Sequence, residues 1–167
     1  IAIQGLAGSY LLGADKSLAT LPVSFYVLGV AFGAIPAALI MERIGRRAGF
    51  MLGAAVAIAG GLISGTSVLA DSFLWLVIGS SILGFSGSFA QQYRFAAADA
   101  GSAAFRARAI AWVLSGGVVA AIVGPQTVIL TRRLFDPIPF VGGFYAMSVF
   151  ALLAFGVLAF LDGEARA

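Results

Sequence analysis

Charged side chains are sparse along this chain, and they separate six long stretches that contain no Asp, Glu, Lys or Arg. The stretches are 1–14, 17–41, 48–70, 72–93, 109–131 and 137–161, and the last five are each 22 to 25 residues long. About 20 apolar residues in a helix cross the hydrocarbon core of a bilayer, so each of these five predicts one transmembrane helix. The first stretch has only 14 residues, and we interpret it as the outer part of a helix whose start is missing from this sequence.

The composition agrees with a membrane protein. The chain is 61% hydrophobic and 10% charged, whereas soluble domains average about 45–50% apolar and about 25% charged residues. We therefore expect an all-α, polytopic membrane helix bundle at residues 1–161, with an incomplete first helix, and a cytoplasmic tail at 162–167 that begins a linker.

Several kinds of chemistry are excluded or disfavoured by the residue types. The sequence contains no Cys and no His, which excludes disulfides, thiolate zinc sites and imidazole catalysis within it. No two acids share a helix face inside a predicted span, so we expect no enzyme, no cofactor and no metal site. The net charge of +3 is too small to indicate nucleic-acid binding.

The basic residues predict an orientation in the membrane. Seven would lie on one side: Arg43, Arg46, Arg47, Arg94, Arg106, Arg108 and Arg166. Three would lie on the other: Lys16, Arg132 and Arg133. Cytoplasmic loops of membrane proteins carry an excess of Lys and Arg, so the first set and both termini are predicted to be cytoplasmic.

Small residues recur at four-residue spacing in the predicted spans, at Gly29/Gly33, Gly49/Gly53, Gly61/Gly65, Gly84/Ser88 and Gly116/Ala120/Gly124. Such stripes let helix backbones approach closely in lipid. Tight packing explains them; sliding of helices during a conformational cycle is the alternative interpretation.

The short connection between the second and third stretches has a distinctive sequence, Ala-Leu-Ile-Met-Glu-Arg-Ile-Gly-Arg-Arg, at residues 38–47. It resembles the signature loop of the major facilitator superfamily, in its usual place between helices 2 and 3. Ala38 stands where the family usually has Gly, and Glu42 where it usually has Asp. Gly45 would supply the positive φ that a tight helix–helix turn requires.

The resemblance implies a cytoplasmic gate. Glu42, Arg43 and Arg46, in a motif completed by Gly45 and Arg47, would latch the cytoplasmic ends of two halves when the transporter faces outward. A second cluster, Arg94, Asp99, Arg106 and Arg108, would join the same network, and we expect Glu42–Arg94 and Asp99–Arg106 ion pairs as hypotheses. The alternative is a basic loop that only fixes the topology.

Other positions bear on coupling and gating. Gly124-Pro125 resembles the end of a glycine-rich element of antiporters, and Pro125 is expected to kink its helix, because it removes one backbone hydrogen bond. Ser80 occupies the position where proton-coupled drug antiporters carry an Arg. None of the five complete stretches has an ionisable residue in its interior, so the chain shows no proton relay of its own.

The resemblance predicts the N-terminal half of the family fold, two inverted three-helix repeats. Such a protein would be a secondary-active transporter of the bacterial inner membrane that moves a small molecule or ion by alternating access, in the lipid bilayer and with a second six-helix half or partner subunit. A non-transporting scaffold or assembly subunit is the alternative, because fold alone does not fix function. The sequence leaves open whether the chain is a fragment or a complete six-helix subunit.

Overall fold

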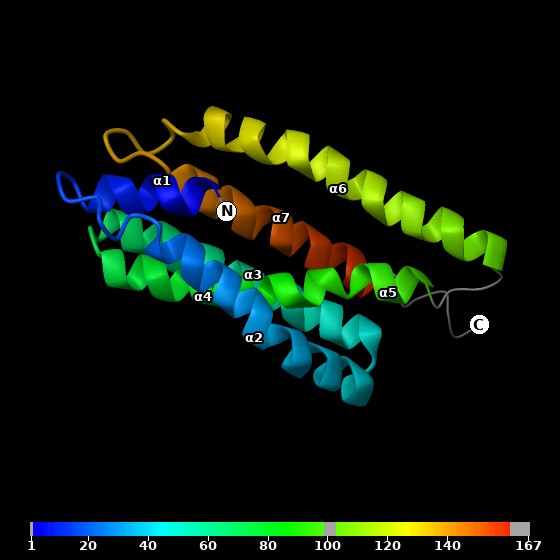
Figure 1. The fold of residues 1–167 in the computed structure, drawn as a ribbon. Coiled ribbons are helices and arrows are strands. Elements are labelled where there is room, and N and C mark those ends of the chain that lie inside the picture. Colours follow the sequence, from blue (N-terminus) through cyan, green and yellow to red (C-terminus); the bar gives the residue numbers. More distant parts are fainter. Residues whose placement is uncertain (1, 99–102, 161–167) are drawn as a thin grey trace.

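The fold is a bundle whose long helices lie roughly along one axis (Figure 1). The computed structural model describes residues 2–98 and 103–160, and all regular secondary structure in these ranges is helical. The helices are α1 (Ala2–Leu11), α2 (Leu21–Ile44), α3 (Arg46–Leu69), α4 (Phe73–Gln91), α5 (Tyr93–Ala98), α6 (Ala103–Thr131) and α7 (Val141–Phe160). Helices α3 and α6 are antiparallel to α2, α4 and α7 (Figure 1). Five segments are long and apolar enough to cross a membrane: Leu21–Ile44, Arg46–Leu69, Phe73–Phe95, Phe105–Thr131 and Val141–Phe160. The predicted all-α membrane bundle with five complete spans is confirmed.

Two helix boundaries differ from the prediction. The first helix ends at Leu11 rather than continuing through residue 14. The stretch 94–108, predicted as a connection, is largely helical, because α5 follows α4 after the single residue Gln92 and α6 begins at Ala103. Charges mark where a helix leaves the hydrocarbon, and a helix can continue beyond that point into the headgroup region.

Helices α3 and α4 form the centre of the bundle, with α2 packed along α4 and α7 packed along α3. The α2–α4 contact is close because glycine lies on both sides of it. A Cβ atom at Gly29 would collide with the Ser81 carbonyl oxygen, and a Cβ atom at Gly84 would collide with the Tyr26 carbonyl oxygen. The glycine stripes predicted in α2 and α4 are therefore packing surfaces.

The α3–α7 contact uses the same device. Gly61 faces the Ser148 hydroxyl and Gly65 faces the Tyr145 ring. The Ser148 hydroxyl also donates a 3.2 Å hydrogen bond to the carbonyl oxygen of Ile58 in α3. Polar side chains that bridge helices in this way replace the hydrophobic driving force, which lipid does not provide.

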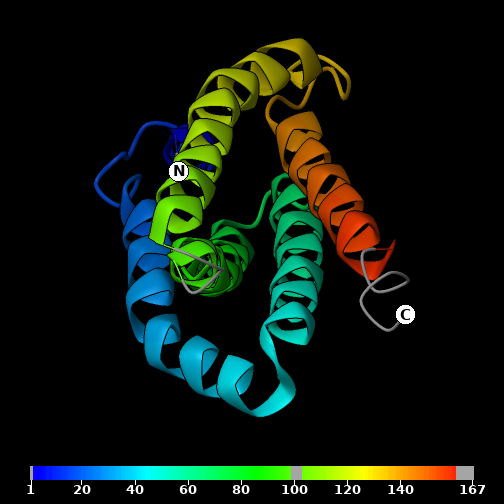
Figure 2. The same ribbon diagram turned by 90° about the vertical axis from the view of Figure 1, so that its right-hand side faces the viewer.

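Helix α6 stands apart from the rest of the bundle. None of the α6 side chains that the structure describes is buried, and a Cβ atom added at Gly116, Gly117 or Gly124 would meet no neighbouring atom within 4 Å. Contact with α7 is made near the end of α6, where Gly142 lies against the Thr131 carbonyl group. Figure 2 shows α6 and α7 diverging from this connection. The stripe at Gly116 and Gly124 thus packs against nothing in the described chain.

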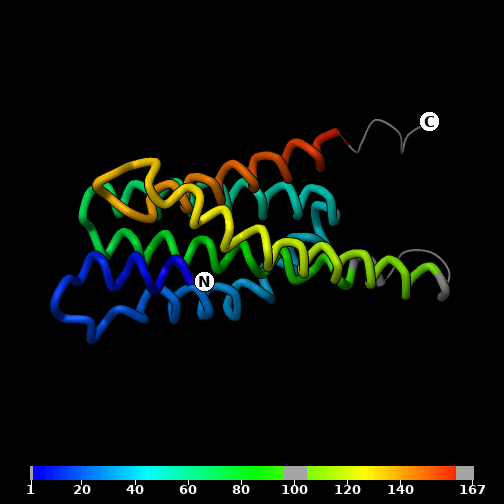
Figure 3. Tube along the Cα trace, turned by 90° about the horizontal axis from the view of Figure 1, so that it is seen from above, coloured from blue at the N-terminus to red at the C-terminus, as the bar shows by residue number. Residues whose placement is uncertain are grey.

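The connections gather at two ends of the bundle (Figure 3). We call one of them the arginine-rich end; it carries Arg43, Arg46, Arg47, Arg94, Arg106 and Arg108. The opposite end holds the connections 12–20, 70–72 and 132–140, with Lys16, Arg132 and Arg133. The uneven distribution of basic residues that the sequence predicts is thus present at the two ends of the described chain.

Candidate functional site at the arginine-rich end

The turn between α2 and α3 consists of one residue. α2 ends at Ile44 and α3 begins at Arg46, and Gly45 between them has φ of 86° and ψ of 156°. These angles are essentially restricted to glycine, since a Cβ atom would clash with the backbone. The predicted positive φ is confirmed, and the turn holds the charged residues of the motif at the end of the bundle.

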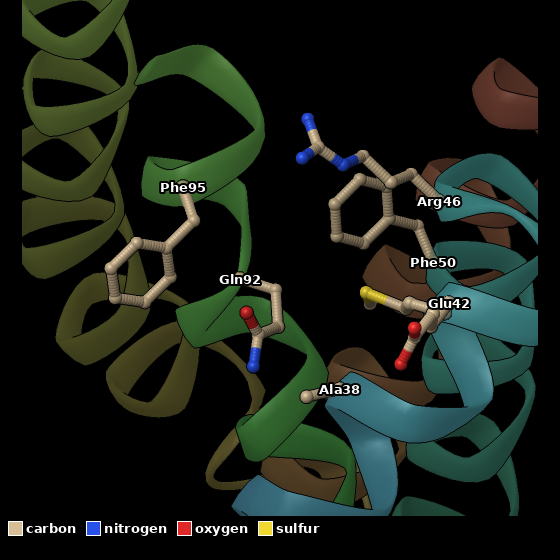
Figure 4. Close-up of a pocket in the computed structure, with 7 residues that line it drawn as sticks. Ala38, Glu42, Arg46, Phe50, Gln92 and Phe95 are labelled. Carbon is tan, nitrogen blue, oxygen red and sulfur yellow. The ribbon is translucent and has the colours of Figure 1, made fainter. Parts of the chain in front are cut away.

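A pocket of about 260 Å³ opens beside this turn. Its lining comes from α2, from α3, and from the junction of α4 with α5: Ala38, Met41, Glu42, Arg46, Phe50, Gln92 and Phe95. Figure 4 shows Arg46, Phe50 and Glu42 on one side of the pocket and Gln92 and Phe95 on the other. The pocket therefore combines an apolar wall with one acid, one base and one amide.

The apolar wall of the pocket is held by aromatic stacking. The rings of Phe50 in α3 and Tyr93 in α5 are stacked, with centroids 4.2 Å apart and planes at 20°. Phe50 is buried, and it belongs to a core cluster with Ala37, Met41 and Phe89. This packing fixes α5 against α3, and it orients the side chains that surround the pocket.

Glu42, Arg43 and Arg46 are all exposed at this end. Glu42 and Arg46 line the pocket, and Arg43 lies in the last turn of α2. Exposed charges of both signs, next to an apolar wall, can form ion pairs and hydrogen bonds with another protein segment. Within the part of the chain that the structure describes, no Asp or Glu cluster could hold a metal ion.

Arg47 has a different environment from the other motif residues. It is half-buried, and its guanidinium group donates from Nε to the Leu158 carbonyl oxygen at 2.7 Å and from Nη2 to the Ala159 carbonyl oxygen at 2.8 Å. A cation at a helix C-terminus satisfies unpaired carbonyl groups and interacts favourably with the helix dipole. Arg47 thus joins the start of α3 to the end of α7, a contact that sequence reasoning missed, because 111 residues separate Arg47 from Leu158.

The predicted second cluster is only partly within the described residues. Arg94 donates from Nη2 to Oε1 of Gln91 at 2.6 Å, and no ion pair joins Arg94 to Glu42, both of which the structure describes. The proposed Glu42–Arg94 pair is therefore absent from this conformation. Arg106 and Arg108 lie exposed on the first turns of α6. Asp99 falls outside the described residues, so the Asp99–Arg106 pair stays a prediction.

The predicted hinge lies far along α6 from this end. The helix continues without interruption through Gly124 and Pro125 to Thr131. Both residues are exposed in the described chain, so any hinge function there remains a prediction.

Comparison with known proteins decides the family. The model of the Major Facilitator Superfamily matches residues 2–167. The chain belongs to the Major Facilitator Superfamily. The helices described above and this membership identify an integral, multi-pass membrane protein of a transport family.

Two curated relatives extend this assignment. The chain is 48% identical, over 161 residues, to "Riboflavin transporter RfnT" of Brucella anthropi, a match that covers 96% of the chain and 40% of that protein. It is 26% identical, over 160 residues, to "Uncharacterized MFS-type transporter YddS" of Bacillus subtilis, covering 95% of the chain and 36% of that protein. The chain thus spans less than half the length of these relatives. No solved structure gave a significant match.

Proposed function

We propose that this chain forms the N-terminal six-helix half of a secondary-active transporter that carries riboflavin or a closely related flavin by alternating access. The observation that carries the proposal is the 48% identity to a riboflavin transporter, spread over 96% of the chain. Identity this high over six helices is expected to extend to the residues that face the solute. A second six-helix half would complete the solute path, which in this kind of transporter lies between repeats near the midplane.

The arginine-rich end would be the cytoplasmic gate of this transporter. Its residues Glu42, Arg43 and Arg46 lie exposed where a second half could contact them, and the pocket beside them offers an apolar surface for a helix end. Closing this end would require the charges to pair across the two halves, and opening it would return them to water. Because such exposed pairs are worth little individually, the gate could open and close without a large energy barrier.

The orientation follows from the same residues. The excess of arginine at this end of the bundle supports a cytoplasmic location for it. Both chain termini of the six-helix unit would then also be cytoplasmic.

The direct test is uptake by the full-length protein in proteoliposomes, followed by riboflavin fluorescence. The wild-type protein is expected to show saturable uptake, and Arg46→Ala is expected to slow it about tenfold or more. Arg133→Ala, an exposed arginine at the opposite end, is the matched control, and it is expected to leave the rate nearly unchanged.

Two results would contradict the proposal. Saturable uptake of other solutes without any riboflavin flux would show that riboflavin is not the substrate, while the assignment as a transporter would stand. A purified, folded protein that moves no solute and co-purifies with a fixed partner would instead favour the scaffold function.

A further inference from the structure

Three buried polar side chains in the described interior of the bundle, Gln4, Ser64 and Ser80, have no hydrogen-bond partner for their polar atoms. Of these, Gln4 and Ser80 lie on two helices that contact each other, α1 and α4. Gln4 of α1 and Ser80 of α4 are both completely buried. Neither amide atom of Gln4, Nε2 or Oε1, has a partner, and the Ser80 hydroxyl has none. An unpaired polar group is costly in a protein interior, and inside a membrane water cannot easily replace the missing partner.

These two side chains face the same apolar core. Gln4 lies in α1 between Ile3 and Ala7, and Ser80 lies in α4 between Leu76 and Leu83. These four apolar residues belong to one buried cluster. Residues three or four positions apart share a helix face, so Ser80 projects with Leu76 and Leu83, and Gln4 projects with Ala7.

The neighbours of α1 indicate the direction of Gln4. Ile3 covers Gly143 of α7, and Gly8 lies against Pro22 at the start of α2. Gln4 follows Ile3 by one residue and precedes Gly8 by four, so it points between α7 and α2. Helix α4 contacts α1, and residues of both helices belong to the same buried cluster.

The depths of the two residues also agree. Gln4 is seven residues before the end of α1 at Leu11, and Ser80 is seven residues after the start of α4 at Phe73. Both of these helix ends lie at the end of the bundle opposite to the arginine-rich end (Figure 3). At 1.5 Å per residue, Gln4 and Ser80 both lie about 10 Å below that end.

Two other buried serines, Ser67 and Ser88, have hydrogen-bond partners, whereas Ser64 of α3, like Ser80, has none. The hydroxyl group of Ser67 donates to the Ser64 carbonyl oxygen at 2.7 Å, and that of Ser88 donates to the Phe85 carbonyl oxygen at 2.6 Å. Bonding to the preceding turn is the usual way for a serine in a membrane helix to satisfy itself. Ser80 does not do so, and Gln4, with a longer side chain, makes no such bond either.

We infer that Gln4, assisted by Ser80, is the specificity-determining group that binds the imide edge of the transported solute. This inference rests on the proposed function. A carboxamide presents a donor beside an acceptor, and the pyrimidine ring of a flavin presents an N–H between two carbonyl groups. Gln4 Oε1 would accept from the ring N3–H, Gln4 Nε2 would donate to one carbonyl oxygen, and the Ser80 hydroxyl would donate to a carbonyl oxygen as well.

Solute access requires α1 to move relative to α4, because Gln4 is fully buried in the conformation described here. The contact of α1 with α2 is made through glycines on the α1 side. Gly5 and Gly8 form the α1 side of that contact, opposite Val23 and Pro22. Movement that exposes Gln4 would therefore exchange an unpaired amide for one bonded to solute, which favours the loaded state.

The test compares riboflavin with a riboflavin analogue methylated at ring N3, in proteoliposomes that contain the full-length protein. The wild type is expected to transport the methylated analogue with a KM at least tenfold higher, because the site loses an N–H donor and gains a methyl group. Gln4→Met has a similar shape and no hydrogen-bonding amide, and it is expected to raise the KM for riboflavin about tenfold. The discrimination, meaning the ratio of the KM for the methylated analogue to the KM for riboflavin, is expected to fall to within a factor of two in this variant. Ser80→Ala is expected to reduce it partly, and the matched control Ser67→Ala not at all.

A second readout separates binding from structure. Riboflavin is expected to raise the Tm of the wild type and not that of Gln4→Met, whereas the Tm of the ligand-free proteins is expected to stay equal or rise in the variant. If Gln4→Met does not fold, the ratio of KM values for the two flavins in Ser80→Ala tests the inference instead. Wild-type discrimination in both Gln4→Met and Ser80→Ala would overturn this inference alone. A wild type that takes up no flavin would overturn the proposed function on which the inference rests.

Discussion

The Nε atom of Arg47 lies 2.7 Å from the carbonyl oxygen of Leu158 and donates a hydrogen bond to it. With the second bond to Ala159, this contact connects the start of α3 to the end of α7. The arginine therefore acts on helix packing, and its neighbours Arg43 and Arg46 are exposed at the surface.

Replacing Arg47 with Ala is expected to lower the free energy of unfolding by about 1–3 kcal/mol, since two charge-assisted hydrogen bonds are lost from a half-buried site. Arg47→Lys is expected to recover only part of this loss, because an ammonium group cannot reproduce the two-pronged geometry of a guanidinium group. Thermal unfolding of the full-length protein in detergent measures both variants. Arg43→Ala is the control, and a Tm shift as large as that of Arg47→Ala would contradict the assigned contact.

Replacing Gly45 with Ala is expected to destabilise the protein by about 1–3 kcal/mol, because φ of 86° with ψ of 156° is strained for any residue with a Cβ atom. Crowding by other parts of the structure is not the cause, since no atom beyond the adjacent residues lies within 4 Å of the added methyl group. The measurement is again thermal unfolding. Gly116→Ala, also in open space but on a helix, is expected to be neutral or slightly stabilising; equal losses in the two variants would argue against backbone strain.

Adding a methyl group at Gly84 is expected to separate α2 from α4, at a cost of about 1–3 kcal/mol, because the new atom would collide with the main-chain carbonyl of Tyr26. Gly87→Ala, one turn further along α4, meets the ends of the Tyr26 and Val30 side chains, which can adjust. Its cost is therefore expected to be smaller. The yield of folded protein and its Tm test this order, and a larger effect at Gly87 would contradict it.

The orientation can be tested by single-cysteine labelling, for which this chain provides a background without cysteine. Arg43→Cys is expected to react with a membrane-impermeant thiol reagent only in inside-out vesicles. Lys16→Cys at the opposite end is expected to react only in intact cells. Both side chains are exposed, so protection of the wrong variant would mean that the proposed orientation is inverted.

The fold was predictable where it depends on local chemistry. Runs of 22 to 25 residues without charge predict the spans because the hydrocarbon thickness sets their length, and Gly45 predicts the turn because few residues tolerate its φ. The stripes at Gly29 and Gly84 predict close packing, although they do not identify the partner helix.

The rest depends on contacts between distant parts of the chain. Nothing near Arg47 in the sequence distinguishes it from Arg46. In the structure, however, Arg47 bonds to the end of α7, whereas Arg46 lines a pocket. The missing partners of Gln4 could not be inferred either, because an amide in an apolar run is equally compatible with a bonded core position. The charge positions also gave a wrong prediction for residues 94–108, which were expected to be a connection between helices. These residues are largely helical, because helices continue past the membrane edge.

The length of α6 has a consequence for its position in the bilayer. Its 29 residues extend about 43 Å, against a hydrocarbon thickness of about 30 Å. Part of this excess is the charged first turns, since the stretch without charge begins at residue 109. The excess length is accommodated by tilting or by protrusion of the helix into the interfacial layer. Arg106 and Arg108 stand on the first turns of α6, where protrusion would place their guanidinium groups among lipid phosphates. The surrounding lipid would thereby fix the height of this helix, which the described chain itself leaves largely unsupported.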